Sequence, residues 1–84
     1  MITLLYFARL RETFGLSSEQ ANLPAGVADI ESLTEWLRQR GGAWQEELAR
    51  DKPVRVAVNQ DMAAPDTAVR DGDEIAYFPP VTGG

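Results

Sequence analysis

The chain has 84 residues, of which 44% are hydrophobic, and this size and composition suit one small domain with a compact core. It contains neither cysteine nor histidine, which excludes a disulfide framework, a thiolate metal site and the usual nucleophile–base pairs. The 13 acidic residues outnumber the 8 basic ones, and the formal net charge is −5. Nucleic acid is therefore not expected as a partner, because phosphate binding needs a basic surface.

The N-terminal segment, residues 1–9, is apolar but short. It lacks the basic region and the cleavage signal of a secretory leader, and it is too short to span a membrane. We therefore expect a cytoplasmic protein with no membrane association. Residues 2–9 predict a strand that is buried on both faces in the middle of a sheet. Residues 11–15 predict a turn in which Gly15 adopts a positive φ.

The middle of the chain predicts one main helix. Residues 19–23 indicate a second, partly exposed strand, and Asp29 then has the side chain and position of a helix N-cap. The residues that follow are spaced to give one apolar helix face: Ile30, Leu33, Trp36 and Leu37. Trp44 and Leu48, four residues apart, indicate a short second helical segment near residues 43–49.

The C-terminal third predicts strands joined by tight turns. Val54, Val56 and Val58 alternate with more polar residues, which is typical of a half-buried strand. Residues 59–61 predict a turn, residues 62–63 a brief strand, and residues 70–73 a second turn around a glycine. Three acidic residues near that glycine lack the spacing of a calcium loop and are assigned to the turn: Asp71, Asp73 and Glu74. Residues 74–78 predict the final strand.

These elements predict an α+β protein. A mixed sheet with one main helix across one face, and with the first and last strands together in its middle, satisfies the burial that both kinds of element need. This is the ubiquitin-like β-grasp architecture. We expect the β-grasp domain to occupy residues 1–78 and a flexible C-terminal Gly-Gly tail to occupy residues 79–84.

The tail combines stiff and thin residues. Pro79 and Pro80 favour an extended exit from the last strand, whereas Gly83 and Gly84 have no Cβ and fit a narrow channel. A carboxylate on Gly84 that ATP converts to an acyl-adenylate can be attacked by a sulfur nucleophile that displaces AMP. Small residues gather at many chain ends, so the glycines alone do not distinguish a reactive tail from an ordinary terminus.

Four segments carry a resemblance that covers nearly the whole chain. They are Phe-Ala-Arg-Leu-Arg-Glu at residues 7–12, Val-Asn-Gln at 58–60, Asp-Gly-Asp-Glu at 71–74 and Phe-Pro-Pro-Val-Thr-Gly-Gly at 78–84. With these segments the chain resembles the small, sulfur-carrying subunits of molybdopterin synthase, which belong to the superfamily of ubiquitin-like β-grasp sulfur carriers. The last segment is the most specific of the four.

The resemblance implies a non-catalytic subunit that binds no cofactor of its own. Gly84 would be carried as a glycyl adenylate and then as a thiocarboxylate (1-thioglycine), with Gly83 as the thin neck. The sulfur would pass to cyclic pyranopterin monophosphate to build the molybdopterin dithiolene. The implied partners are the large subunit, in a heterotetramer of two small and two large subunits, an adenylyltransferase related to ubiquitin-activating enzymes, and a sulfurtransferase.

Several residues are candidates for contact with the partner. Tyr77 and Phe78 must point to opposite faces of the last strand, and the resemblance favours Phe78 as the less buried contact. Met62 is either an ordinary edge residue or an adaptable interface contact, and Arg11 is either solvated or paired with the partner. The resemblance adds the tail to this interface: Pro79, Pro80, Val81 and Thr82.

Three alternatives remain open at this point. The chain could be the sulfur carrier for thiamine thiazole synthesis, which shares the β-grasp body and the Gly-Gly end. It could be a ubiquitin-like protein modifier that is joined to lysines through Gly84, because the chemistry is the same as far as the adenylate. It could also be a structural binding module, which would keep its function without Gly83 and Gly84.

Overall fold

The computed structural model describes residues 1–80, and the predictions for Val81, Thr82, Gly83 and Gly84 fall outside this part of the chain. The strands are β1 (Ile2–Tyr6), β2 (Ser18–Ala21), β3 (Arg55–Val58), β4 (Asp61–Met62) and β5 (Glu74–Phe78). The helices are α1 (Ala8–Phe14), α2 (Ile30–Arg38) and α3 (Ala43–Glu47). Within residues 1–80, no helix has both the length and the apolar character needed to cross a membrane.

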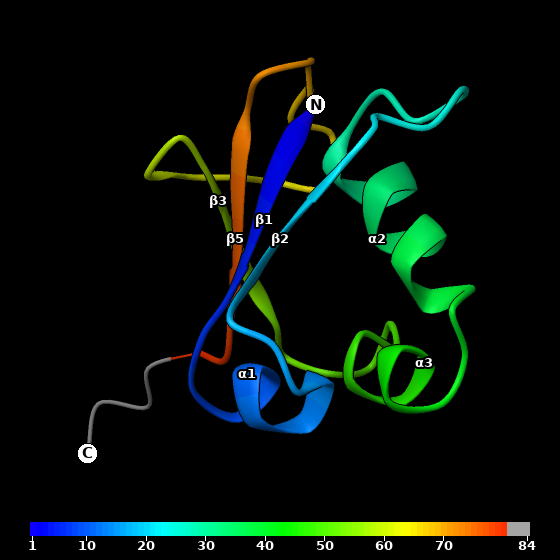
Figure 1. Cartoon of the computed structure of the whole chain (residues 1–84), viewed down its shortest axis with the longest axis vertical. Coiled ribbons are helices and arrows are strands. Elements are labelled where there is room, and N and C mark those ends of the chain that lie inside the picture. Colours follow the sequence, from blue (N-terminus) through cyan, green and yellow to red (C-terminus); the bar gives the residue numbers. More distant parts are fainter. Residues whose placement is uncertain (81–84) are drawn as a thin grey trace.

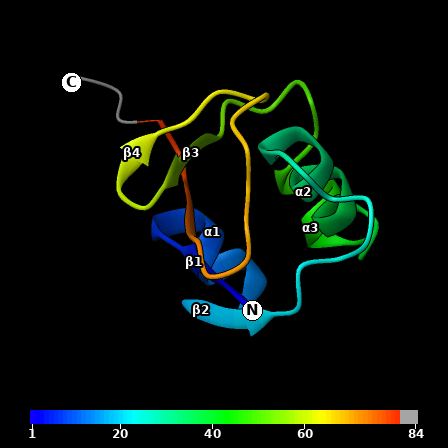
Figure 2. The same cartoon turned by 90° about the horizontal axis from the view of Figure 1, so that it is seen from above.

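The strands form one mixed sheet in the order β2-β1-β5-β3-β4. β1 and β5 pair in parallel inside the sheet, and the other neighbours pair antiparallel. α2 and α3 lie on one side of the sheet, as the two views in Figures 1 and 2 show. The predicted α+β class, the mixed sheet and the adjacent first and last strands are confirmed.

The N-terminal prediction was wrong in its bounds. β1 ends at Tyr6, and the residues expected to form a turn belong to α1. Leu10 and Phe14, four residues apart, give the reason: a helical turn buries Leu10 and packs Phe14 against the core. Gly15 caps this helix in the left-handed conformation with φ 76°, so the predicted positive φ is confirmed.

The start of α2 follows the predicted cap. An Asp29 carboxylate oxygen accepts a hydrogen bond of 2.8 Å from the backbone N–H of Ser32, and the Ser32 hydroxyl accepts one of 3.2 Å from the N–H of Asp29. This reciprocal capping box satisfies donors that the helix itself leaves free. The Ser32 hydroxyl also donates a hydrogen bond of 2.6 Å to this carboxylate, and this bond and the one from the Ser32 N–H lower the pKa of the Asp29 carboxyl group.

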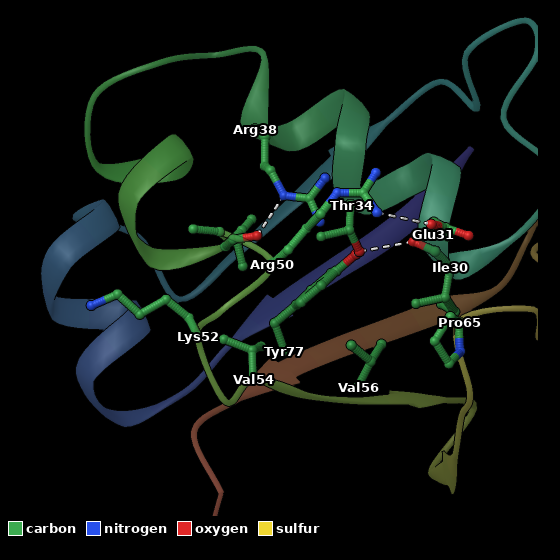
Figure 3. Close-up of a pocket in the computed structure, with 12 residues that line it drawn as sticks. Ile30, Glu31, Thr34, Arg38, Arg50, Lys52, Val54, Val56, Pro65 and Tyr77 are labelled. Carbon is green, nitrogen blue, oxygen red and sulfur yellow. Dashed lines mark hydrogen bonds and ion pairs between the residues drawn. The ribbon is translucent and has the colours of Figure 1, made fainter.

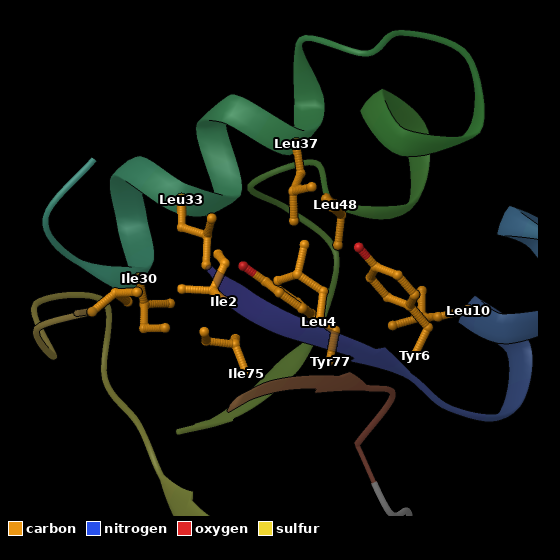
Figure 4. Packing of buried hydrophobic residues seen from close by; sticks show 11 residues of the cluster. Ile2, Leu4, Tyr6, Leu10, Ile30, Leu33, Leu37, Leu48, Ile75 and Tyr77 are labelled. Atoms are coloured by element: carbon orange, nitrogen blue, oxygen red, sulfur yellow. The ribbon is translucent and has the colours of Figure 1, made fainter. Parts of the chain in front are cut away.

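The core lies between the sheet and the helix layer. Leu33 and Leu37 of α2 point toward β1, where Ile2 and Leu4 are fully buried (Figure 4). The remaining buried members come from all parts of the described chain: Tyr6, Leu10, Ile30, Leu48, Val69, Ile75 and Tyr77. One apolar cluster therefore holds the first and last strands against α2.

An aromatic stack joins the two short helices. The rings of Phe14 in α1 and Trp44 in α3 are nearly parallel, with centroids 3.8 Å apart, and Tyr6 of β1 meets both edge-on. The Arg40 guanidinium lies 4.5 Å from the centroid of Trp44 and 5.0 Å from that of Trp36. Both tryptophans are thus packing residues, and α1 is fixed at one end of the sheet.

Candidate functional site

The candidate site is the end of β5 together with the sheet surface around it. β5 lies between β1 and β3, and its last residue, Phe78, is paired with Arg55 of β3. On the other edge, the N–H of Phe7 donates a hydrogen bond of 3.2 Å to the carbonyl of Tyr77. The base of the tail is therefore held from both sides up to its last strand residue.

The face of the sheet opposite α2 carries a row of mostly apolar residues. The strand register aligns one residue from each strand across the sheet: Ser18, Leu5, Ala76, Ala57 and Met62. Side chains on neighbouring strands that are directly opposed point to the same face, so these residues form a continuous strip. We call this surface, together with Phe7 and Phe78, the open face.

Phe78 lies where the sequence placed it. Tyr77 is fully buried in the core, whereas Phe78 is half-buried on the other side of the strand. The expected opposite orientation of these two residues is confirmed, and the role of Phe78 as a partner contact stays a prediction. Phe78 is adjacent to Ala76 along one face of β5 because side chains alternate along a strand.

Phe7 is an open-face residue that the sequence analysis missed as a site residue. It is extended, with φ −122° and ψ 155°, and it is 46% exposed. The next residue, Ala8, has a φ of 53° and begins α1. An aromatic residue one position past the end of a strand was the available signal, but the predicted strand ran on to residue 9 and hid it.

Met62 and Arg11 are both exposed. Met62 is 61% exposed at the outer edge of the sheet, and it closes the row that begins on β2. Arg11 lies on α1, which contacts β5 at the end of the sheet where the chain leaves Phe78 (Figure 1). Met62 is therefore part of the open face, and Arg11 lies at the end of the sheet near the base of the tail.

Pro79 and Pro80 are half-buried in the structure. Pro80 lines a hollow of about 390 Å³ together with Arg55 of β3 and Met62 of β4. Neither proline has an N–H to offer to a neighbouring strand, so the backbone pairing of β5 has no continuation through them. The first two residues after β5 thus lie close to the edge formed by β3 and β4.

Three groups with shifted pKa values lie on strands of the sheet: Tyr6 on β1, Glu19 on β2 and Tyr77 on β5. Burial would raise the pKa of Glu19, but hydrogen bonds from Arg40 and Tyr6 outweigh it and lower the pKa. Arg40 holds this carboxylate through its two terminal guanidinium nitrogens, at 2.8 and 3.1 Å. Burial raises the pKa of Tyr6 far above its usual range, and it raises the pKa of Tyr77 to about 12. These phenols act as hydrogen-bonding members of the core.

The acidic turn before β5 is held by its own hydrogen bonds. An Asp73 carboxylate oxygen accepts a bond of 2.8 Å from the N–H of Arg70, and the other accepts one of 3.0 Å from the Asn59 amide. Gly72 provides the positive φ, 93°, that the turn needs. No group of three potential metal ligands comes together within residues 1–80. Asp71 and Asp73 lie in or beside this turn as predicted, whereas Glu74 is the first residue of β5.

A five-stranded mixed sheet with parallel first and last strands and a helix across one face defines a β-grasp protein of the ubiquitin-like class. A family model described as the ThiS family matches residues 4–84. The chain belongs to the ThiS family.

The relatives with a curated name share the full length of the chain. It is 43% identical over 84 residues to the molybdopterin synthase sulfur carrier subunit of Haemophilus influenzae, with all of both chains covered. It is 37% identical, again over the whole of both chains, to the protein of the same name from Escherichia coli.

Two solved structures of proteins with different names share the fold of this chain. The small archaeal modifier protein 1 of Haloferax volcanii is 27% identical, with a TM-score of 0.79 and coverage of 95% of this chain and 97% of that one. A chain in the complex of subunits 1 and 2 of the Helicobacter pylori molybdopterin-converting factor is 25% identical, with a TM-score of 0.61 and coverage of 99% and 97%.

Proposed function

We propose that this chain is the sulfur carrier subunit of molybdopterin synthase. The observation that carries the proposal is the full-length identity of 43% to a protein of that name, with every residue of both chains covered. The anchored base of the tail and the apolar open face beside it support the proposal, because a carrier must present its end to another protein.

In the proposed chemistry, the reacting group is the carboxylate of Gly84. ATP converts it to a glycyl adenylate, which makes its carbonyl carbon a good electrophile. A sulfur nucleophile supplied by a sulfurtransferase attacks this carbon, the bond to AMP breaks, and the terminus is left as a thiocarboxylate. That sulfur then goes to cyclic pyranopterin monophosphate, and the dithiolene of molybdopterin requires repeated transfers. Gly83 leaves the neck of the tail narrow enough for a partner's channel.

The open face is the proposed docking surface for the large subunit. The large apolar residues of this surface are Phe7, Leu5, Met62 and Phe78, and the other members of the row are small. Interfaces rely on a few such anchors. Arg11, exposed on α1, is included in the proposed contact, and the tail extends the contact through residues 79–82. The solved complex of two molybdopterin-converting factor subunits supports a large-subunit partner.

One further partner and an assembly complete the proposal. An adenylyltransferase related to ubiquitin-activating enzymes acts on Gly84 before the sulfur is added. Two small and two large subunits form the heterotetramer, with each tail entering an active site of a large subunit. The chain itself supplies the thiocarboxylate and binds no separate cofactor.

Intact-mass spectrometry tests the proposal directly. The chain is purified from a cell that makes molybdenum cofactor and is measured before and after incubation with the large subunit and the pterin precursor. We expect a mass shift that matches replacement of one oxygen by sulfur, and we expect it to disappear on that incubation. A shift that persists would contradict the proposed pathway.

A C-terminal extension provides an independent test. One residue added after Gly84 displaces the reactive carbonyl, so sulfur transfer should be abolished while thermal unfolding stays as in the parent chain. Normal pterin synthesis with such a variant would refute the role of Gly84.

Two other functions have a specific observation in their favour. The family description is that of the ThiS family, which favours testing the sulfur carrier of thiamine thiazole synthesis, and a sulfur-bearing terminus consumed only by that pathway would identify it. The structural match to a small archaeal modifier protein favours testing a protein modifier. Stable lysine-linked adducts of Gly84, with no sulfur-bearing form, would identify the modifier.

A further inference from the structure

A groove lies on the helix side of the sheet, away from the open face. Its main hollow has a volume of about 310 Å³ and is bounded by α2, by the segment that follows α3, and by the start of β3 (Figure 3). The two valines that face it, Val54 and Val56, are only half-buried. α2 therefore leaves this part of the sheet partly uncovered.

The floor of the groove offers an apolar surface with no unmet polar group. Val54, Val56 and Ile30 line it, and the only hydroxyls there belong to Thr34 and Tyr77. These two hydroxyls are hydrogen-bonded to each other at 2.8 Å, and the Thr34 hydroxyl also donates to the carbonyl of Ile30 at 2.8 Å. An apolar side chain can enter without breaking a hydrogen bond.

The rim of the groove is basic in a chain that is acidic as a whole. Three of the 8 basic residues of the sequence surround this one hollow: Arg38, Arg50 and Lys52. Arg38 is already ion-paired with Glu35, which lies outside the lining. Glu31 is the one carboxylate among the lining residues, and it accepts a bond of 3.3 Å from Arg50 in a pair that is exposed on both sides. Within residues 1–80, Lys52 is in none of the ion pairs.

The groove is long enough for an extended chain. The main hollow shares four lining residues with the hollow beside Pro80: Ile30, Val54, Val56 and Pro65. The second hollow extends the depression past β3 to the edge of the sheet, where Pro80 and Met62 of the open face also line it. A compact small molecule would use only one part of this depression.

We propose that this groove binds a segment of a partner protein in which a large apolar side chain is flanked by carboxylates. The apolar side chain packs on the valines, and the carboxylates pair with Arg50 and Lys52 at the rim. The main hollow is lined by no residue of the tail and lies on the opposite side of the sheet from the row that includes Ala76 and Ala57. A segment that occupies the main hollow leaves that row free, so the chain can hold both partners together.

The test uses the full chain labelled with nitrogen-15 and a synthetic peptide with a central leucine between aspartates and glutamates. NMR titration should shift the amide signals of groove residues such as Thr34, Ala49 and Val56, with a dissociation constant below about 1 mM. Higher salt should weaken this binding because the rim pairs are exposed. Control peptides replace the leucine by alanine or the acids by their amides, and both should bind more weakly.

Two charge reversals form a matched pair. Lys52→Glu removes a rim cation, and Arg70→Glu makes the same change of charge on an exposed residue outside the groove. Lys52→Glu should weaken peptide binding about 3- to 10-fold, since it loses an exposed ion pair and adds a repulsion. Arg70→Glu should change it by less than about 2-fold.

Several results would overturn the proposal. Absence of any shift at about 1 mM peptide, shifts confined to open-face amides, or equal weakening by the two reversals would each do so. Equal binding of a simple fatty carboxylate would assign the groove to small molecules instead. Shifts of the groove signals with protein concentration alone would assign it to a second copy of the chain.

Discussion

Replacing Met62 by alanine offers a quantitative test of the proposed docking surface. Burying a whole methionine side chain contributes about 1.5–3 kcal/mol, and 61% of the Met62 surface is still exposed in the free chain. Docking can therefore gain about 0.9–1.8 kcal/mol from this residue, which corresponds to a loss of about 5- to 20-fold in affinity for Met62→Ala. The fold should lose less than about 1 kcal/mol, since Met62 lies on the two-residue edge strand β4.

The assay is calorimetric titration of the purified large subunit with the parent chain and the variant. Gln45→Ala is the control, because Gln45 is exposed on α3, in the helix layer on the other side of the sheet. It should leave the affinity unchanged, and urea unfolding should show that both variants remain folded. An affinity of Met62→Ala within 2-fold of the parent would place Met62 outside the interface and refute the reasoning.

The remaining predictions concern stability. Folding lowers the pKa of Glu19, so the ionised side chain stabilises the fold above its unfolded pKa, near 4.5, and this stabilisation is lost as the pH falls through the folded value. Glu19→Gln should therefore lower the free energy of unfolding by about 1 kcal/mol at pH 7. Urea unfolding should show that the difference between the two chains shrinks below pH 4.5. Tyr77→Phe should cost about 1 kcal/mol, because Thr34 keeps its bond to a helix carbonyl, and a thermal melt that does not move would contradict this. Ala8→Gly should raise the melting temperature by about 4–8 °C, since Ala8 has a φ of 53°, whereas Gly15→Ala should lower it.

Some elements could be read from the sequence because their signals are local. The last strand was predicted with its bounds as found, since a turn around Gly72 precedes it and two prolines, which cannot continue the pairing, follow it. Asp29 was identified as a helix cap from its side chain and from the apolar face that follows it. Such signals need no knowledge of distant parts of the chain.

Other features depend on contacts between distant residues. α1 has seven residues, and it is held by Leu10 in the core and by the stack of Phe14 on Trp44, which lies 30 positions further along the sequence. The open face was missed as a surface because it depends on register: Leu5 and Ala57 become neighbours of Ala76 only once both strands have paired with β5. The sequence indicated Met62 and Phe78 singly, and the sheet joins them into one surface.

The position of β5 also determines how the chain responds to force. β5 is bonded along both edges, to β1 and to β3, as far as its last two residues. A pull on Pro79 acts along the strand axis, so it loads these bonds in shear and all together, instead of opening them one after another from an end. A partner that binds the tail and exerts a force on it can therefore pull on the chain without separating its last strand from the sheet.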